Sequence, residues 1–142
     1  MIIPEGYIMI ANKATEQYKE SSIFTASPEE LTLMLYNGLI KFIMQAQMAI
    51  DEKDVQKSHD CIVKAENIVS EFQVTLDKNY EISNNLMLIY DYMNRRLVDA
   101  SIKKDREILS EVLDLAKDLR DTWTQAMKLA KQQVPKTQQI AK

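Results

Sequence analysis

Few residues in this sequence could do chemistry. The one histidine, His59, stands two positions before the one cysteine, Cys61, and this pair of residue types can bind zinc or act as base and nucleophile. Two positions on a helix correspond to a rotation of about 200°, so the two side chains cannot bind one ion together. We therefore predict no metal site here, and we interpret Cys61 as a small hydrophobic residue of the core.

The residue patterns of metal and nucleotide sites are also missing from the sequence. A di-iron bundle needs a Glu-x-x-His pair on each of two helices, and one histidine cannot supply both. The two glycines, Gly6 and Gly38, form no glycine-rich loop for a phosphate. Neighbouring carboxylates such as Asp114 and Asp118 are typical of a solvated helix face. The sequence therefore predicts a protein that is not an enzyme and binds no metal or cofactor.

The composition favours one small helical domain. Of 142 residues, 46% are hydrophobic and 27% are charged, while 2 glycines and 3 prolines are few for the turns of a sheet protein. A net charge of −3 without a run of Lys and Arg disfavours nucleic-acid binding. A single cysteine, and no apolar run of about 18 residues, predict a cytoplasmic protein without membrane insertion.

Start and stop signals divide the chain into four helices. The motif SPEE at 27–30 supplies a serine cap, a proline suited to the first helical position and a glutamate that completes a capping box. It predicts a first helix over residues 28–51. Three further helices begin at candidate caps: Asp54 for 54–77, Ser83 for 84–103, and Asp105 for a last helix that ends by Val134-Pro135.

Apolar residues recur every seven positions in these helices, which is the stripe of a bundle helix. The main series are Val55, Ile62, Val69 and Leu76, then Leu86, Met93 and Ala100, then Leu109, Ala116, Trp123 and Ala130. They predict an all-α fold, an antiparallel four-helix bundle over residues 25–134, with Trp123 in its core. Residues 1–24 are predicted to be a flexible N-terminal arm with a candidate short helix over 12–21, and residues 135–142 a disordered tail.

The first helix carries a second apolar stripe. Leu33, Ile40 and Met44 project roughly 140 to 180° away from the main core face, at 100° per residue. One interpretation is that this helix is central and that the N-terminal arm covers its far side. The other is that the stripe lines a groove for a partner helix. The two interpretations are compatible, because a partner that binds more strongly can displace an arm.

Three motifs resemble those of the FliS family of flagellin export chaperones. They are TASPEELTLMLYNG at 25–38, YDYMNRRL at 90–97 and DTWTQA at 121–126, in the family's order and at matching separations, with Tyr18 ten residues before Pro28. Residues 1–11 depart from the family's pattern, because the N-terminal arm of this chain is longer than is usual in the family. The resemblance extends over about nine tenths of the chain.

The resemblance implies a helical bundle that binds the disordered C-terminal segment of flagellin, prevents premature polymerisation and delivers flagellin to the flagellar export gate. It also implies that the N-terminal arm docks on the export gate, and it assigns this role to Tyr18. The alternative interpretation is that the Tyr18 ring packs on the bundle as a lid. The predicted partner-binding residues are therefore Tyr18, Leu33, Ile40 and Met44. A self-assembling bundle, a homodimer with a structural or scaffolding role, is the alternative, and an enzyme with a dispersed site comes third.

Overall fold

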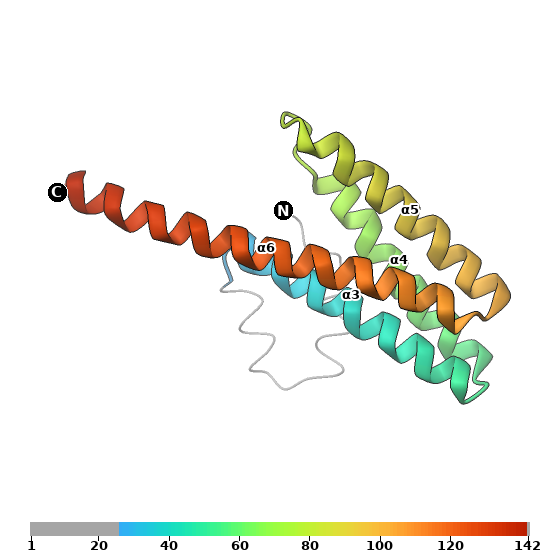
Figure 1. Cartoon of the computed structure of the whole chain (residues 1–142). Helices are drawn as coiled ribbons and strands as arrows, with labels where there is room; N and C mark the ends of the chain where they lie inside the picture. The colour runs from blue at the N-terminus through green and yellow to red at the C-terminus, as the bar shows by residue number, and fades with distance from the viewer. Residues whose placement is uncertain (1–25, 142) are drawn as a thin grey trace.

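Over residues 26–141 the chain forms four helices that pack side by side (Figure 1). The computed structural model describes residues 26–141, and the side chains as far as residue 132. The helices are α3 (Pro28–Asp51), α4 (Val55–Thr75), α5 (Ile82–Lys103) and α6 (Arg106–Ala141). Each helix contacts its neighbours in sequence, and α6 also contacts α3, which closes a ring. Successive helices run in opposite directions, so the prediction of an antiparallel four-helix bundle is confirmed.

Three of the four predicted helix starts are capped as expected. The Ser27 hydroxyl accepts a hydrogen bond from the backbone N–H of Glu30 at 3.2 Å, and α3 begins at the following proline. Asp54 accepts from the N–H of Lys57 at 3.1 Å at the start of α4. Asp105 accepts from the N–H of Glu107 at 2.9 Å before α6. These side chains satisfy N–H groups that the first turn of a helix leaves without partners.

The predicted cap of the third helix is wrong. The cap position of α5 is Glu81, the helix begins at Ile82, and no side chain caps it. The Ser83 hydroxyl donates a hydrogen bond to the backbone carbonyl of Asp77 instead. Ser83 is buried, and a buried hydroxyl needs a partner, which the Asp77 carbonyl of the preceding loop provides.

The core lies along the predicted stripes in the middle of each helix. Of the predicted positions, Ile62, Val69, Met93, Ala100, Leu109 and Ala116 are all buried. The stripes fail at the helix ends, where Val55 is 61% exposed and Ala130 is also exposed. Trp123 is half-buried and packs against the core cluster, so its predicted burial is only partial. A seven-residue series identifies the inward face of a helix but does not show how far the neighbouring helices reach.

Helix α6 extends past the ends of the other helices (Figure 1). It runs through Pro135 to Ala141, so the prediction that it ends by Val134 is wrong. A proline inside a helix costs about 3 kcal/mol, but Lys, Gln and Ala around it are good helix formers. The disorder of residues 135–142 in solution stays a prediction. The predicted arm, residues 1–24, lies outside the described residues.

Three aromatic residues join three helices at the centre of the core. The Phe72 ring of α4 lies between Tyr36 of α3 and Tyr90 of α5, with centroid distances of 4.5 and 5.5 Å. The two tyrosine hydroxyls share a hydrogen bond at 2.9 Å. Burial raises the pKa of both tyrosines, most strongly that of Tyr36, whose pKa the neighbouring Tyr90 raises further. The hydroxyls therefore stay neutral and satisfy each other inside the core.

Candidate functional site

The second stripe of α3 lies beside α6. Gln47, seven residues after Ile40 on the same row of the helix, donates a hydrogen bond to Ser110 of α6 at 2.9 Å. The row that contains Leu33 and Ile40 therefore faces the seam between the two helices rather than open solvent. This explains why Ile40 is only 7% exposed and belongs to the core cluster, although the helical pattern alone predicted that it points away from the core.

The predicted partner-binding residues thus lie at different depths. Ile40 is buried, Leu33 is half-buried, and Met44 is 47% exposed. Tyr18 lies outside the described residues. Met48, one turn after Met44, is 55% exposed and was not among the predicted site residues, although its spacing of four from Met44 could have included it. We call Met44 and Met48 the methionine face of α3.

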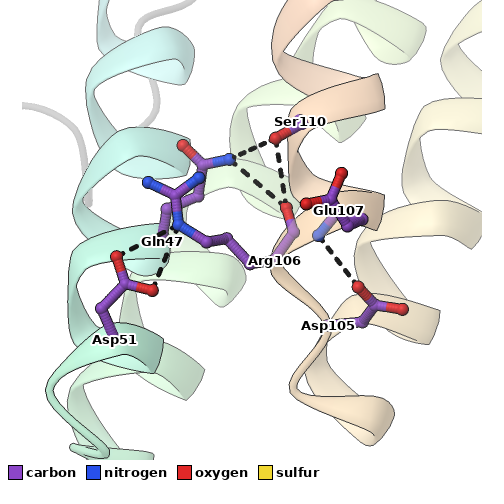
Figure 2. Close-up of polar contacts among 6 residues, drawn as sticks. All are labelled: Gln47, Asp51, Asp105, Arg106, Glu107 and Ser110. Atoms are coloured by element: carbon purple, nitrogen blue, oxygen red, sulfur yellow. Dashed lines mark hydrogen bonds and ion pairs between the residues drawn. The ribbon is translucent and has the colours of Figure 1, made fainter.

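A polar cluster fixes α6 against the last turns of α3 (Figure 2). The Gln47 amide nitrogen donates to the Ser110 hydroxyl and, at 3.4 Å, to the backbone carbonyl of Arg106. The Arg106 Nε donates to both carboxylate oxygens of Asp51 at 3.1 Å. Gln47 is 5% exposed, so its amide bonds avoid the cost of a buried polar group without partners. These bonds therefore fix the register of α6 against the end of α3 that carries the methionine face.

The other end of the same seam is held by Trp123. Its indole Nε1–H donates to the backbone carbonyl of Glu29, in the first turn of α3, at 3.0 Å. Residues 29 and 123 are far apart in the sequence, so this bond closes the ring of helices where α6 begins to extend past α3.

We expect Trp123→Phe to lower the free energy of unfolding by about 1 kcal/mol, because it keeps an apolar ring but removes one hydrogen-bond donor. Urea melts followed by circular dichroism measure the change. Tyr80→Phe is the control, since Tyr80 is 65% exposed in the loop before α5 and should change stability by less than about 0.5 kcal/mol. If Trp123→Phe and the wild type were equally stable, the hydrogen bond from Trp123 to Glu29 would not stabilise this seam.

His59 and Cys61 take up unrelated environments. His59 Nδ1 lies 3.4 Å from the Ser101 hydroxyl on α5, within hydrogen-bond distance, and the ring is exposed. Cys61 is buried, and burial raises the pKa of its thiol, which keeps the sulfur protonated and a poor nucleophile. Over residues 26–132, no three His, Cys, Asp or Glu side chains come together in the manner of a metal site. The described helices include none that is long and apolar enough to span a membrane.

Comparison with known proteins decides the family. Residues 11–130 match the family model described as flagellar protein FliS. The chain belongs to the FliS family. It is 47% identical to the flagellar secretion chaperone FliS of Bacillus subtilis over 110 residues, which cover 78% of this chain and 83% of that protein. It is 34% identical to the FliS of Salmonella typhimurium, over 75% of this chain and 81% of the relative.

The fold agrees with the FliS assignment. A crystal structure of a bacterial flagellar chaperone superposes with a TM-score of 0.68 at 18% sequence identity and covers 82% of this chain and 96% of its own. At this identity the likeness concerns the helical architecture alone.

Proposed function

We propose that this protein is a flagellar secretion chaperone that binds the disordered C-terminal segment of flagellin, prevents its premature polymerisation and delivers it to the flagellar type III export apparatus. The observation that carries the proposal is the FliS match over residues 11–130, together with relatives named flagellar secretion chaperones. Such a chaperone acts in the cytoplasm, before export, by binding rather than by catalysis.

There is a physical reason for the chaperone to cover one end of a flagellin subunit. Subunits that join head to tail propagate an open helical filament, so covering one self-association segment stops growth. Ordering a disordered segment is costly, and the chaperone must bury apolar area in several places to gain affinity. The methionine face suits this task, because methionine side chains are flexible and adapt to a helix that folds against them.

Met44 is a better probe of client binding than Ile40. Ile40 is buried, so a polar substitution there disturbs folding as well as binding. Met44 and Met48 are about half exposed, so replacing them costs the folded bundle little. We keep Leu33 and Ile40 in the proposed site as residues that a client reaches only after the seam around them opens, and Tyr18 as a residue that docks on the export gate.

We expect the double variant Met44→Asp, Met48→Asp to bind a synthetic flagellin C-terminal peptide more weakly by about 1–3 kcal/mol, because each carboxylate would have to lose its hydration on contact with the apolar client. Isothermal titration calorimetry gives the affinity, and urea melts should show nearly wild-type stability. Val74→Asp is the control, since Val74 is 79% exposed on α4, a different helix.

The results of the peptide titration distinguish a client site on the methionine face from the other interpretations. Unchanged peptide affinity in the double variant would place the client elsewhere on the bundle. A wild-type protein that ignores the peptide and self-associates would instead support the structural homodimer considered from the sequence.

A further inference from the structure

The exposed surface of α3 is rich in methionine, whereas its buried surface contains none. From residue 35 to residue 50 the exposed positions are Asn37, Lys41, Met44 and Met48, so half of them carry a thioether. The buried positions of α3 hold other residue types, mainly Leu, Ile, Phe and Ala. Methionines that only filled gaps in the packing would lie inside the bundle. Helix α3 instead presents two thioether sulfur atoms on the side that faces solvent.

Exposed thioethers react with hydroperoxides such as hydrogen peroxide. A lone pair of the sulfur attacks one peroxide oxygen, so an S–O bond forms and the O–O bond breaks. The second oxygen keeps the bonding electrons, takes up a proton and leaves as water. The sulfur is thereby oxidised by two electrons and the peroxide is reduced. The product, methionine sulfoxide, is polar, and methionine sulfoxide reductases convert it back to methionine.

The other sulfur atoms of the described residues are less accessible. Met93 is 0% exposed. Three further methionines are half-buried, namely Met34, Met87 and Met127. Cys61 is buried, and burial raises the pKa of its thiol, so it holds little of the reactive thiolate. Within residues 26–132, a hydroperoxide should therefore react first with the methionine face.

We propose that the methionine face is a reversible oxidation site, at which a hydroperoxide converts Met44 and Met48 to sulfoxides and thereby releases the flagellin segment. This inference rests on the proposed function, because it concerns regulation of the same surface. Each sulfoxide oxygen is hydrated in the free chaperone and must lose that hydration under an apolar client. A sulfoxide reductase removes the oxygen and restores client binding.

The two sulfoxides lie under one client contact. Residues four apart on a helix are neighbours, with Cβ atoms about 5–6 Å apart, so a client helix that covers Met44 also covers Met48. In the free chaperone both oxygens can point into water, since the side chains are 47% and 55% exposed. Lys41, also exposed, stands three positions before Met44, where its ammonium can donate a hydrogen bond to the sulfoxide. Oxidation should therefore weaken client binding without unfolding the bundle.

Peroxide treatment followed by mass spectrometry locates the reactive sulfur atoms. Trypsin cleaves after Lys41 and Lys53, so the methionine face falls in one peptide, 42–53, whereas Met93 falls in the peptide that ends at Arg95. We expect dilute hydrogen peroxide to add oxygen to peptide 42–53 well before Met93 reacts. Fragment spectra assign the added oxygen to its residue. Oxidation of Met93 as fast as that of peptide 42–53 would contradict the proposal.

Calorimetry with a synthetic flagellin C-terminal peptide measures the effect on the client. Norleucine replaces any methionine in the peptide, and the peroxide is removed before the titration, so that only the chaperone is oxidised. We expect the oxidised wild type to bind about ten- to a hundredfold more weakly, as the loss of one buried apolar contact predicts. Sulfoxide reductases A and B, supplied with a thiol reductant, should restore the affinity, because together they reduce both sulfoxide epimers. Circular dichroism should show the same helix content throughout.

Met44→Leu, Met48→Leu is the matched variant. Leucine keeps the apolar contact but has no sulfur, so this variant should bind the peptide like the wild type, both before and after peroxide treatment. It keeps the other six of the eight methionines, which serve as an internal control. Met127→Leu, at a half-buried position of α6, should lose affinity on oxidation as the wild type does.

The titrations distinguish a failure of this inference from a failure of the proposed function. If the untreated wild type does not bind the peptide, the proposed function is wrong, and regulation of it by oxidation is wrong as well. If the untreated wild type binds, but the affinity persists after Met44 and Met48 have become sulfoxides, only the oxidation site is wrong. Loss of affinity in the oxidised Leu/Leu variant would also overturn the proposal, because a sulfur outside the methionine face would then be responsible.

Discussion

Phe72→Ala should lower the free energy of unfolding by about 3–5 kcal/mol, the largest effect that we expect from a single substitution in this protein. The Phe72 ring is 4% exposed and lies between Tyr36 and Tyr90, so its removal leaves a cavity bordered by three helices. Both tyrosines also lose an aromatic neighbour, which adds to the cost of the lost apolar area. Urea denaturation followed by circular dichroism measures the difference.

The control for this substitution lies two residues away on the same helix. Val74 is 79% exposed, and Val74→Ala should change stability by less than about 0.5 kcal/mol. A loss below about 1 kcal/mol in Phe72→Ala would mean that the three-helix aromatic cluster is not a packed core.

The second large effect concerns alkaline pH. The pKa values of Tyr36 and Tyr90 are raised in the folded state, whereas in the unfolded chain both should be near 10. Below pH 10 the hydroxyls are neutral in both states, and stability does not depend on them. Above pH 10 the unfolded chain releases these protons while the folded protein keeps them. Stability should therefore fall by about 1.4 kcal/mol per pH unit for each hydroxyl, until the folded pKa is reached.

The double variant Tyr36→Phe, Tyr90→Phe isolates this effect from the lysines, which titrate in the same range. It removes both members of the shared hydrogen bond, so its stability at neutral pH should be close to that of the wild type, and its loss of stability above pH 10 should be shallower. The single variant Tyr36→Phe leaves the Tyr90 hydroxyl without this partner and should cost about 1–3 kcal/mol at neutral pH. Identical alkaline slopes in the wild type and the double variant would contradict the raised pKa values.

Local signals predicted the helices well because they depend on a few neighbouring residues. Ser27, Asp54 and Asp105 cap their helices as the sequence indicates, since each cap bond joins residues two or three positions apart. Ser83 is the exception, because α5 already begins at Ile82 and the Ser83 hydroxyl bonds a loop carbonyl six residues earlier. The helical pattern also identified most of the core, which follows from the period of 3.6 residues alone.

The depth of the site residues could not be predicted in the same way. Burial depends on where the neighbouring helices pass, and a helical wheel carries no such information. Ile40 seemed to project outward, but it shares a row with Gln47, which contacts α6. Ala130 continues the stripe of Trp123 but lies beyond the start of α3 and is exposed.

The seam between α3 and α6 has a consequence for synthesis of the chain. Two of its hydrogen bonds, from Gln47 to Ser110 and from Trp123 to Glu29, join residues 63 and 94 positions apart, whereas the α3–α4, α4–α5 and α5–α6 contacts join helices that are neighbours in sequence. A ribosome completes α3, α4 and α5 before residue 123 exists, because synthesis starts at the N-terminus. During that interval Ile40 and its row have no α6 beside them. The nascent chain therefore exposes Ile40, which is buried in the finished bundle, together with the half-buried Leu33. Apolar side chains exposed in this way favour aggregation until the last helix arrives.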